Sequence, residues 1–277
     1  MIGILNQALD SVIRVFFYPI RALNPWVGMT VVSLATSSML LLVFRYLSNQ
    51  QEIRRVKDRI KAHLLEMLLY RDDLRASLRA QGRILSCNLR YLSCTLKPLL
   101  VMSVPVLLVL IHLEFWFGYQ PLKPGEAAIL KVKLAGGMQP SRTRLALQHS
   151  SGIDVETDPL RIDAEREVDW RLRAKEDGRQ KIKLETGGET IEKEVAVGGT
   201  SLSRVSPARV RSSWRDELLN PGEPMIPASS FIERIEISYP RSGMAFLFGW
   251  RPHWLLVYFT LTIIFALVLK PLLKIEF

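Results

Sequence analysis

Three long uncharged apolar stretches interrupt a chain that is otherwise rich in charge. Residues 22–44, 98–113 and 252–269 carry no Asp, Glu, Lys or Arg. A membrane-spanning helix needs about 20 predominantly apolar residues. The pattern therefore predicts three membrane-spanning helices, at residues 25–45, 98–118 and 253–273. Tryptophan and tyrosine lie at one end of the second and third stretches, as is typical of a membrane–water interface. The alternative is a set of three buried core helices.

The first 24 residues show a different, amphipathic pattern. Their apolar side chains recur at helical spacing, with polar and charged residues on the other side. The apolar set is Ile2, Leu5, Leu9, Val12, Ile13, Phe16 and Ile20. This pattern predicts a helix over residues 1–24 that lies in the outer membrane–water interface. A plain tail is the alternative.

Residues 46–97 have the pattern of two helices with narrow apolar seams. The first seam is Ile53, Val56, Ile60, Leu64 and Met67, and the second is Leu74, Leu78, Gln81, Leu85, Leu89, Leu92 and Leu96. Because the chain must leave and re-enter the same membrane face, we expect an antiparallel coiled-coil hairpin. Its turn is predicted near residues 70–73, where an aspartate can cap the second helix. Cys87 and Cys94 are expected to fill the seam as small apolar residues.

The distribution of charge predicts how the chain is oriented. The 277 residues carry 37 Lys and Arg against 27 Asp and Glu, a net charge of +10. Residues 46–97 hold eleven basic and five acidic side chains, whereas residues 119–252 hold 21 and 19. Since basic short loops stay in the cytoplasm, the hairpin and the tail 274–277 are predicted inside, and the amino terminus and residues 119–252 outside. We therefore expect a multi-pass protein of the plasma (inner) membrane.

The basic face of the hairpin is a candidate docking surface. It comprises Arg54, Arg55, Lys57, Arg59, Lys61, Arg75, Arg79 and Arg83. Such a face favours ribosomal RNA, anionic lipid or an acidic partner. An ordinary solvated helix face is the alternative. Because the excess charge is mostly a topology signal, DNA is not an expected partner.

Residues 119–252 change to short, alternating runs separated by Gly, Pro and charged turns. The runs are AAILKVKLA, RLALQHS, GIDVET, EVDWRLRA, GRQKIKLET, TIEKEVAVG and FIERIEISYP. Seven such strands predict an all-β, immunoglobulin-like sandwich outside the membrane. Trp170 is a predicted core residue, and residues 200–230 a predicted loop across the sandwich. No catalytic set, cofactor motif or metal cluster is evident, so no enzymatic activity is expected.

Hydroxyl side chains within the predicted spans are the candidate functional residues. Thr30, Ser33 and Ser37 share one face of the first span, with Arg45 about two turns beyond. We add Ser103 of the second span and Thr260 and Thr262 of the third. A partly hydrated groove lined by these groups would lower the cost of moving a polar segment into the bilayer. Close helix packing is the alternative. His112 and Glu114 are predicted interfacial anchors.

Two sequence segments carry a resemblance to a known family. The first span ends in FRYLSNQ, and the hairpin runs through CNLRYLSCTLKPLLVMSVPVLLVLI, which contains Asn88, Tyr91, Lys97 and Pro98. This arrangement resembles the YidC-like membrane insertase superfamily, most of all its small three-span branch of archaea and the endoplasmic reticulum. The resemblance covers residues 1–118 and, less specifically, 250–273.

The resemblance implies a groove open to the cytoplasm and to lipid, with a hairpin that guides nascent or small membrane proteins into it. Two features depart from the family. The nearest positive residue, Arg45, lies at the inner lip rather than within the groove, and about 115 residues are inserted between the second and third spans. We therefore expect a membrane protein insertase or chaperone, the alternative being an anchored scaffold whose outer sandwich binds an envelope partner.

Overall fold

The structure, a computed structural model, describes residues 11–19, 24–69, 74–199, 202–243, 251–273 and 275, without the side chains of 74–78, 80 and 214. The chain divides into two compact units. The β unit comprises Met1–Gly28 and Val109–Trp254, and the helical unit comprises Met29–Leu108 and Leu255–Phe277. The predicted helix at the amino terminus lies largely outside the described residues, which show helix only over 11–17. The predicted turn at 70–73 also lies outside them.

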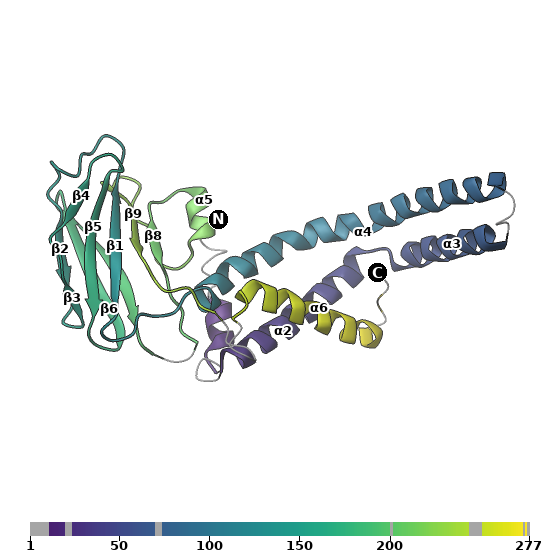
Figure 1. The fold of residues 1–277 in the computed structure, drawn as a ribbon, viewed down its shortest axis with the longest axis horizontal. Coiled ribbons are helices and arrows are strands. Elements are labelled where there is room, and N and C mark those ends of the chain that lie inside the picture. The colour runs from purple at the N-terminus through teal and green to yellow at the C-terminus, as the bar shows by residue number, and fades with distance from the viewer. Residues whose placement is uncertain are drawn as a thin grey trace. The chain divides into compact units, whose positions relative to one another are not determined.

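Four long helices account for the helical unit and its connections to the β unit (Figure 1). They are α2 (Pro25–Leu47), α3 (Gln50–Leu69), α4 (Leu74–Phe117) and α6 (Trp254–Leu273). Within the described residues, three helices are long and apolar enough to cross a membrane: α2, α6 and the 81–117 part of α4. This confirms the prediction of three such helices and indicates a membrane-embedded protein.

The helix boundaries follow from local side chains. The Asn24 side chain accepts the N–H of Trp26 at 3.0 Å, and the Asn49 side chain accepts the N–H of Glu52 at 3.1 Å. These contacts cap the first turns of α2 and α3. Helix α4 continues through Pro98 and Pro105, so the second hairpin helix and the second span form one helix of 44 residues. Each proline removes one backbone hydrogen bond, a loss that apolar helices tolerate.

Ion pairs hold α3 and α4 together in antiparallel order. Arg90 pairs with Glu52 at 2.6 Å, and Arg83 pairs with Glu66 at 3.2 Å. Near the first of these pairs, the ammonium of Lys57 lies 6.0 Å from the centre of the Tyr91 ring. The residues pair in reverse order along the two helices, as an antiparallel hairpin requires.

The prediction for the second seam of this hairpin was wrong. The leucines of this seam whose side chains are described are exposed by 42–63%, namely Leu85, Leu89, Leu92 and Leu96. The half-buried or buried stripe is instead Ile84, Cys87, Tyr91, Cys94 and Pro98. Both stripes have helical spacing, so the pattern alone did not distinguish them. Helix α4 is rotated about its axis so that Arg83 and Arg90 reach the carboxylates of α3. This rotation leaves the leucines exposed.

Nine strands form two antiparallel sheets in the β unit (Figure 1). They are β1 (Ala127–Leu134), β2 (Ala146–His149), β3 (Ile153–Val155), β4 (Leu160–Ile162), β5 (Glu167–Ala174), β6 (Gly178–Thr186), β7 (Glu189–Val197), β8 (Ala208–Val210) and β9 (Ile232–Ile237). One sheet has the order β3-β5-β1-β9-β8 with β4 also on β5, and the other has the order β2-β6-β7.

Alternating side chains of both sheets share one hydrophobic core. Leu130, Val132 and Leu134 of β1 are fully buried, as are Ile182 and Leu184 of β6. All seven predicted strand runs contain a strand, and Trp170 is confirmed as a core residue. Strands β4 and β8 were not predicted, because three residues are too few to show an alternation.

A buried ion pair fixes the segment between β7 and β9 to the sheet. Lys193 is fully buried and donates to the carboxylate of Glu223 and to the carbonyls of Ser206 and Glu194. The second oxygen of Glu223 accepts the N–H of Glu194 at 3.3 Å. Burial lowers the pKa of Lys193, and the adjacent carboxylate opposes that shift. The predicted loop thus packs on the sheet, and it also contains β8 and helix α5 (Trp214–Leu219).

Candidate functional site: hydroxyl groups of helices α2 and α6

Helices α2 and α6 each turn a hydroxyl-bearing face toward the interior of the helical unit. Ser33 and Ser37 of α2 are fully buried, and Thr36 between them is 8% exposed. On α6, Tyr258 and Thr262 are also buried, at 1% and 9% exposure. Spacings of three and four residues place the members of each set on one helix face. We call these five residues the hydroxyl cluster.

Four hydroxyl groups of this cluster lack a hydrogen bond within the described part of the chain. They belong to Ser33, Ser37, Tyr258 and Thr262. The Tyr258 hydroxyl lies near the hydroxyls of Thr36 and Thr262, but neither contact has hydrogen-bond geometry. Buried polar groups in proteins are normally paired with protein or water. The cluster therefore holds hydroxyl groups that would gain hydrogen bonds from water or from a polar ligand.

Ser38 and Ser103 show what hydroxyl groups in these helices do otherwise. The Ser38 hydroxyl donates to the carbonyl of Leu34 at 2.8 Å, and the Ser103 hydroxyl donates to that of Leu100 at 2.7 Å. Both satisfy themselves on their own helix backbone, a common arrangement for serine in an apolar helix. Ser33 and Ser37 do not.

The predicted groove residues are only partly brought together. Ser33, Ser37 and Thr262 belong to the hydroxyl cluster, and Thr30 is half-buried on α2. Thr260 is exposed, on a different side of α6 from Thr262. Arg45 is exposed, and its guanidinium donates to the carbonyl of Leu273 at 3.3 Å. A cation at that carbonyl complements the partial negative charge at the end of α6.

Sequence analysis missed two members of the cluster. Thr36 is not among the candidate groove residues named for the first span, and Tyr258 is the tyrosine of the third stretch that was interpreted as an interfacial residue. The signal was present on both helices. Thr36 follows Ser33 by three residues, and Tyr258 precedes Thr262 by four.

Most of the predicted docking residues of the hairpin are exposed. Arg54, Arg55, Arg59, Lys61, Arg79 and Arg83 are exposed and Lys57 is half-buried, whereas the side chain of Arg75 lies outside the described set. Arg83 and Lys57 also contact the facing helix, as described above. Arg59 and Lys61 therefore lie on a solvent-facing part of α3 that could receive an anionic partner.

Within the β unit, Glu114 joins the end of α4 to the chain that leads into α6. One carboxylate oxygen accepts from Arg241 at 2.7 Å, and the other accepts from the Trp254 ring N–H at 2.9 Å. The Arg241 guanidinium lies 4.5 Å from the centre of the Tyr119 ring. Burial raises the pKa of the Tyr119 hydroxyl, while the nearby Arg241 opposes this shift. Glu114, predicted as an interfacial anchor, thus connects two helix ends.

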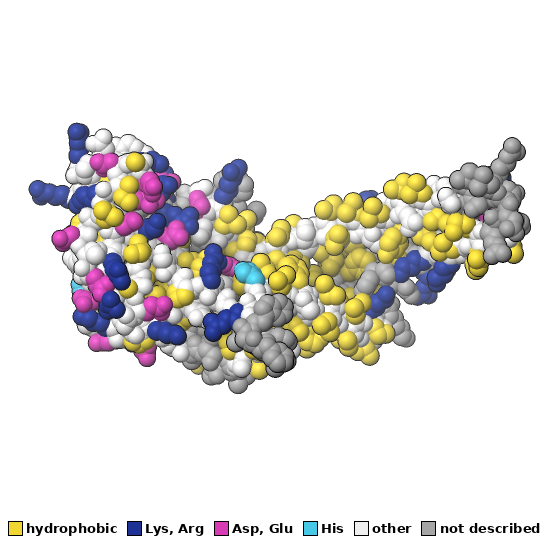
Figure 2. Space-filling view, viewed as in Figure 1, with side chains coloured by type: hydrophobic (Ala, Val, Ile, Leu, Met, Phe, Trp, Pro, Cys, Tyr) yellow, Lys and Arg dark blue, Asp and Glu magenta, His cyan; other side chains and the backbone are white. Residues whose placement is uncertain are grey.

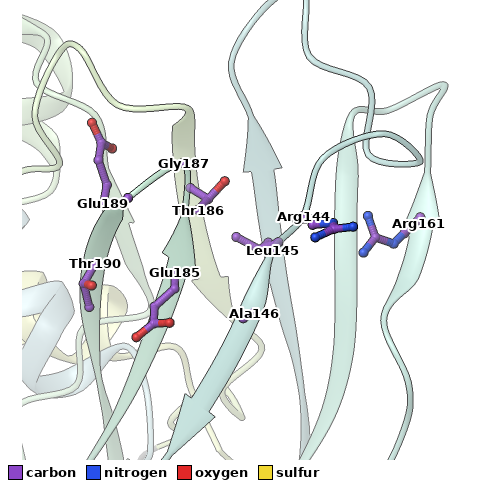
Figure 3. A pocket seen from close by; sticks show the side chains of 10 residues that line it. Arg144, Leu145, Ala146, Arg161, Glu185, Thr186, Gly187, Glu189 and Thr190 are labelled. Atoms are coloured by element: carbon purple, nitrogen blue, oxygen red, sulfur yellow. The ribbon is translucent and has the colours of Figure 1, made fainter.

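The β unit also has an open pocket of about 490 Å³ at one edge of the smaller sheet (Figure 3). Arg144 and Arg161 lie at one end of it, and Glu185 and Glu189 lie at the other (Figure 3). The Arg161 guanidinium donates to the backbone carbonyls of Pro140 and Thr143, so it holds a loop. The lining residues include no Ser, Cys or His, and they do not form a nucleophile with its base.

The described residues contain no group of three His, Cys, Asp or Glu side chains that could hold a metal ion. Comparisons with known proteins add no family to these observations. No family model matches the chain, and no curated protein or solved structure matches it either.

Proposed function

We propose that this protein is a membrane-embedded insertase or chaperone that offers the hydroxyl cluster of α2 and α6 to the polar part of an incoming membrane segment. The observation that carries the proposal is the set of four buried hydroxyl groups without hydrogen-bond partners among the described residues. On this proposal the protein is not an enzyme, and its substrates are nascent or small membrane proteins.

The energetics of burial support this role. Leaving a buried hydroxyl unpaired costs about 1–3 kcal/mol, and lipid offers no alternative partner. Four such groups therefore stabilise any arrangement in which water or a substrate peptide group supplies the missing bonds. A polar segment that crosses an apolar layer has the same need for partners. The hydroxyl cluster and the polar segment would therefore each lower the free-energy cost of burying the other.

The exterior of the helices is consistent with a membrane site. Figure 2 shows hydrophobic side chains over the visible surface of α4 and α6, whereas charged side chains are interspersed over the β unit. On α6 the exposed residues include Leu256, Ile263 and Leu267, which lie on other faces than Thr262. Apolar groups would thus face lipid while the hydroxyl groups face inward.

The remaining parts of the proposal concern docking and orientation. The basic residues of α3 would receive a ribosome, anionic lipid or an acidic partner from the cytoplasm. The amino terminus and the β unit would lie outside the plasma membrane, and the carboxy terminus inside. We also propose that the chain is a member of the YidC-like superfamily. The β unit would then be an immunoglobulin-like domain added to it.

An insertion assay tests the role of the cluster. The full chain is reconstituted in liposomes, and insertion of a small membrane protein with a polar outer segment is measured by protease protection. We expect Ser33→Ala/Ser37→Ala/Thr262→Val to lower the rate of insertion about tenfold, as loss of one to two hydrogen bonds predicts. Ser38→Ala/Ser103→Ala is the matched control, because those hydroxyl groups bond their own helix. Equal insertion by the two variants would refute the proposal.

A second candidate function is an anchored scaffold that binds an envelope partner through the β unit. The observation that favours it is the complete core of this unit, to which both sheets contribute. A connection between two spans does not need a core of this size. Deletion of residues 124–240 would abolish function under this alternative, and the cluster variant would be silent. Under the insertase proposal the cluster variant loses function, and the deletion has the smaller effect.

A further inference from the structure

Two neighbouring cavities in the β unit share part of their lining. The larger has a volume of about 470 Å³ and the smaller about 230 Å³. The residues that line both are Trp116, Gly198, Gly199, Leu202 and Ser203. The lining of the larger cavity also includes Trp26, Tyr119 and Lys123, and that of the smaller one includes Arg179 and Arg204. We call the two together the joined cavity.

The aromatic wall of the joined cavity is held in place by ring contacts. The ring of Phe17 stacks on Trp116 at 4.5 Å between centres, and it meets Phe117 edge-on at 5.8 Å. The lining shared by the two cavities also includes two glycines, Gly198 and Gly199. Gly198 and Gly199 both have positive φ, and a Cβ on Gly198 would overlap the carboxylate of Asp177. The backbone conformation and the close approach of Asp177 therefore require glycine at position 198.

The charged side chains that line the joined cavity are all basic. None of its lining residues is Asp or Glu, although residues 119–252 carry 19 acidic side chains. Its cations are Lys123, Arg179 and Arg204. Arg179 pairs with Glu194 at 3.0 Å, and Arg204 donates to the carbonyl of Pro221. Lys123 is exposed, and its ammonium has no ion-pair partner among the described residues. It is available to an anionic ligand.

The joined cavity lies where the ends of all three apolar helices meet within the β unit. Trp26 is in the first turn of α2, Trp116 is in the last turn of α4, and Phe117 stacks on Trp254 at the start of α6. These three ends belong to one face of a membrane if the helices span it. Tryptophan at such ends lies at the level of the lipid head groups.

We propose that the joined cavity binds the phosphate-bearing head group of an anionic phospholipid. The ammonium of Lys123 would pair with the phosphate, and Ser203 and the backbone at Gly198–Gly199 would contact the glycerol part. The aromatic wall would lie against the start of the acyl chains. This site shares no residue with the hydroxyl cluster and does not depend on insertion activity.

Native mass spectrometry of the delipidated full chain tests this proposal. The protein is released from detergent micelles after addition of phosphatidylglycerol and phosphatidylcholine in equal amounts, or of inorganic phosphate alone. We expect the wild type to retain phosphatidylglycerol in preference. Lys123→Gln should weaken that retention about fivefold, as loss of one partly screened charge pair predicts. Lys131→Gln, an exposed lysine of β1 outside the cavity lining, is the matched control and should retain lipid as the wild type does.

Three outcomes would overturn the proposal. The first is equal retention of the two lipids by the wild type. The second is unchanged retention by Lys123→Gln, which would place any bound lipid elsewhere. The third is retention of inorganic phosphate, added alone, as strongly as that of phosphatidylglycerol, which would identify a soluble phosphate compound as the ligand. Lys123→Arg should bind as the wild type does, because the positive charge is kept.

Discussion

Two regions of this molecule bury polar groups in opposite ways. In the β unit, the ammonium of Lys193 meets three acceptors, and both oxygens of Glu223 accept hydrogen bonds. In the hydroxyl cluster, Ser33, Ser37, Tyr258 and Thr262 have no such partners within the described residues. The more costly group to bury, a charge, is fully paired, whereas the less costly hydroxyl groups are not.

The difference separates a structural role from a binding role. A fully paired buried charge rigidifies the segment that it joins, and it leaves nothing for a ligand to satisfy. An unpaired buried hydroxyl does not stabilise the fold, and its missing bond is gained when a partner arrives. Substitutions should therefore affect different properties in the two regions. In the first they should lower the stability of the fold, and in the second they should weaken binding.

The largest expected effect is on the paired charge. Lys193→Met leaves the Glu223 carboxylate buried without its cation, and breaking such a pair costs about 3–5 kcal/mol. We expect the melting temperature of the β unit to fall by roughly 10–20 °C, measured by circular dichroism of the full chain in detergent. Lys193→Met/Glu223→Leu should recover most of the loss. If the single substitution leaves the melting temperature unchanged, the ion pair does not hold this segment.

A smaller effect is expected where the two helix ends meet. Glu114→Gln keeps an acceptor for the Trp254 ring N–H but removes the charge that Arg241 contacts. The loss of about 1 kcal/mol should increase hydrogen exchange at the Ser242 amide about fivefold, because that amide bonds the carbonyl of Gly118 beside this contact. Glu236→Gln, from an exposed pair with Arg234, is the control and should leave this amide unchanged. Equal exchange in both variants would contradict the expectation.

Two fully buried serines give the most direct form of the comparison. Ser230 of the β unit accepts the N–H of Ile232 at 3.1 Å, whereas Ser37 has no partner among the described residues. Ser230→Ala should cost about 1 kcal/mol, since it leaves a buried donor unpaired. Ser37→Ala should leave stability unchanged or raise it slightly. Thermal unfolding of the full chain measures both. A loss of stability in Ser37→Ala would mean that its hydroxyl supports the fold.

These differences also explain which features the sequence could predict. Apolar length predicts a span because the bilayer sets one dimension for every helix, and alternation predicts β1 or β5 because a sheet has two faces. The exposed stripe of Leu85 and Leu89 could not be identified, because two stripes on α4 have equally good spacing. The choice between them depends on the contacts of Arg83 and Arg90 with another helix.

The candidate site was only partly predictable for a similar reason. The spacing of Ser33 and Ser37 predicts a common face, and both are buried on that face. Spacing does not show whether a hydroxyl bonds its own backbone, which separates Ser38 from Ser37. Nor does it show that Tyr258 comes from another helix to complete the set. The joined cavity was missed entirely, because Trp26 and Lys123 are far apart in sequence.

The smallest expected effect concerns an exposed carboxylate on the surface of the smaller sheet. Glu192 of β7 contacts Lys181 at 3.1 Å and Lys183 at 3.5 Å, both on β6. The hydrogen bond from Lys181 lowers the pKa of Glu192 below its ordinary value of 4.5. A carboxyl group with a lowered pKa in the folded state stabilises the fold above its ordinary pKa. That contribution is lost as the pH falls through the lowered value.

Glu192→Gln should therefore flatten the pH dependence of stability. Below pH 4.5 the melting temperature of the wild type should fall more steeply than that of the variant, and near neutral pH the two should differ little, because water screens an exposed pair. Melting curves of the full chain between neutral pH and pH 3 measure the difference. Identical slopes would show that this surface pair contributes nothing. The paired charges that matter to the fold would then be only the buried ones, and the contrast with the unpaired hydroxyl cluster would become sharper.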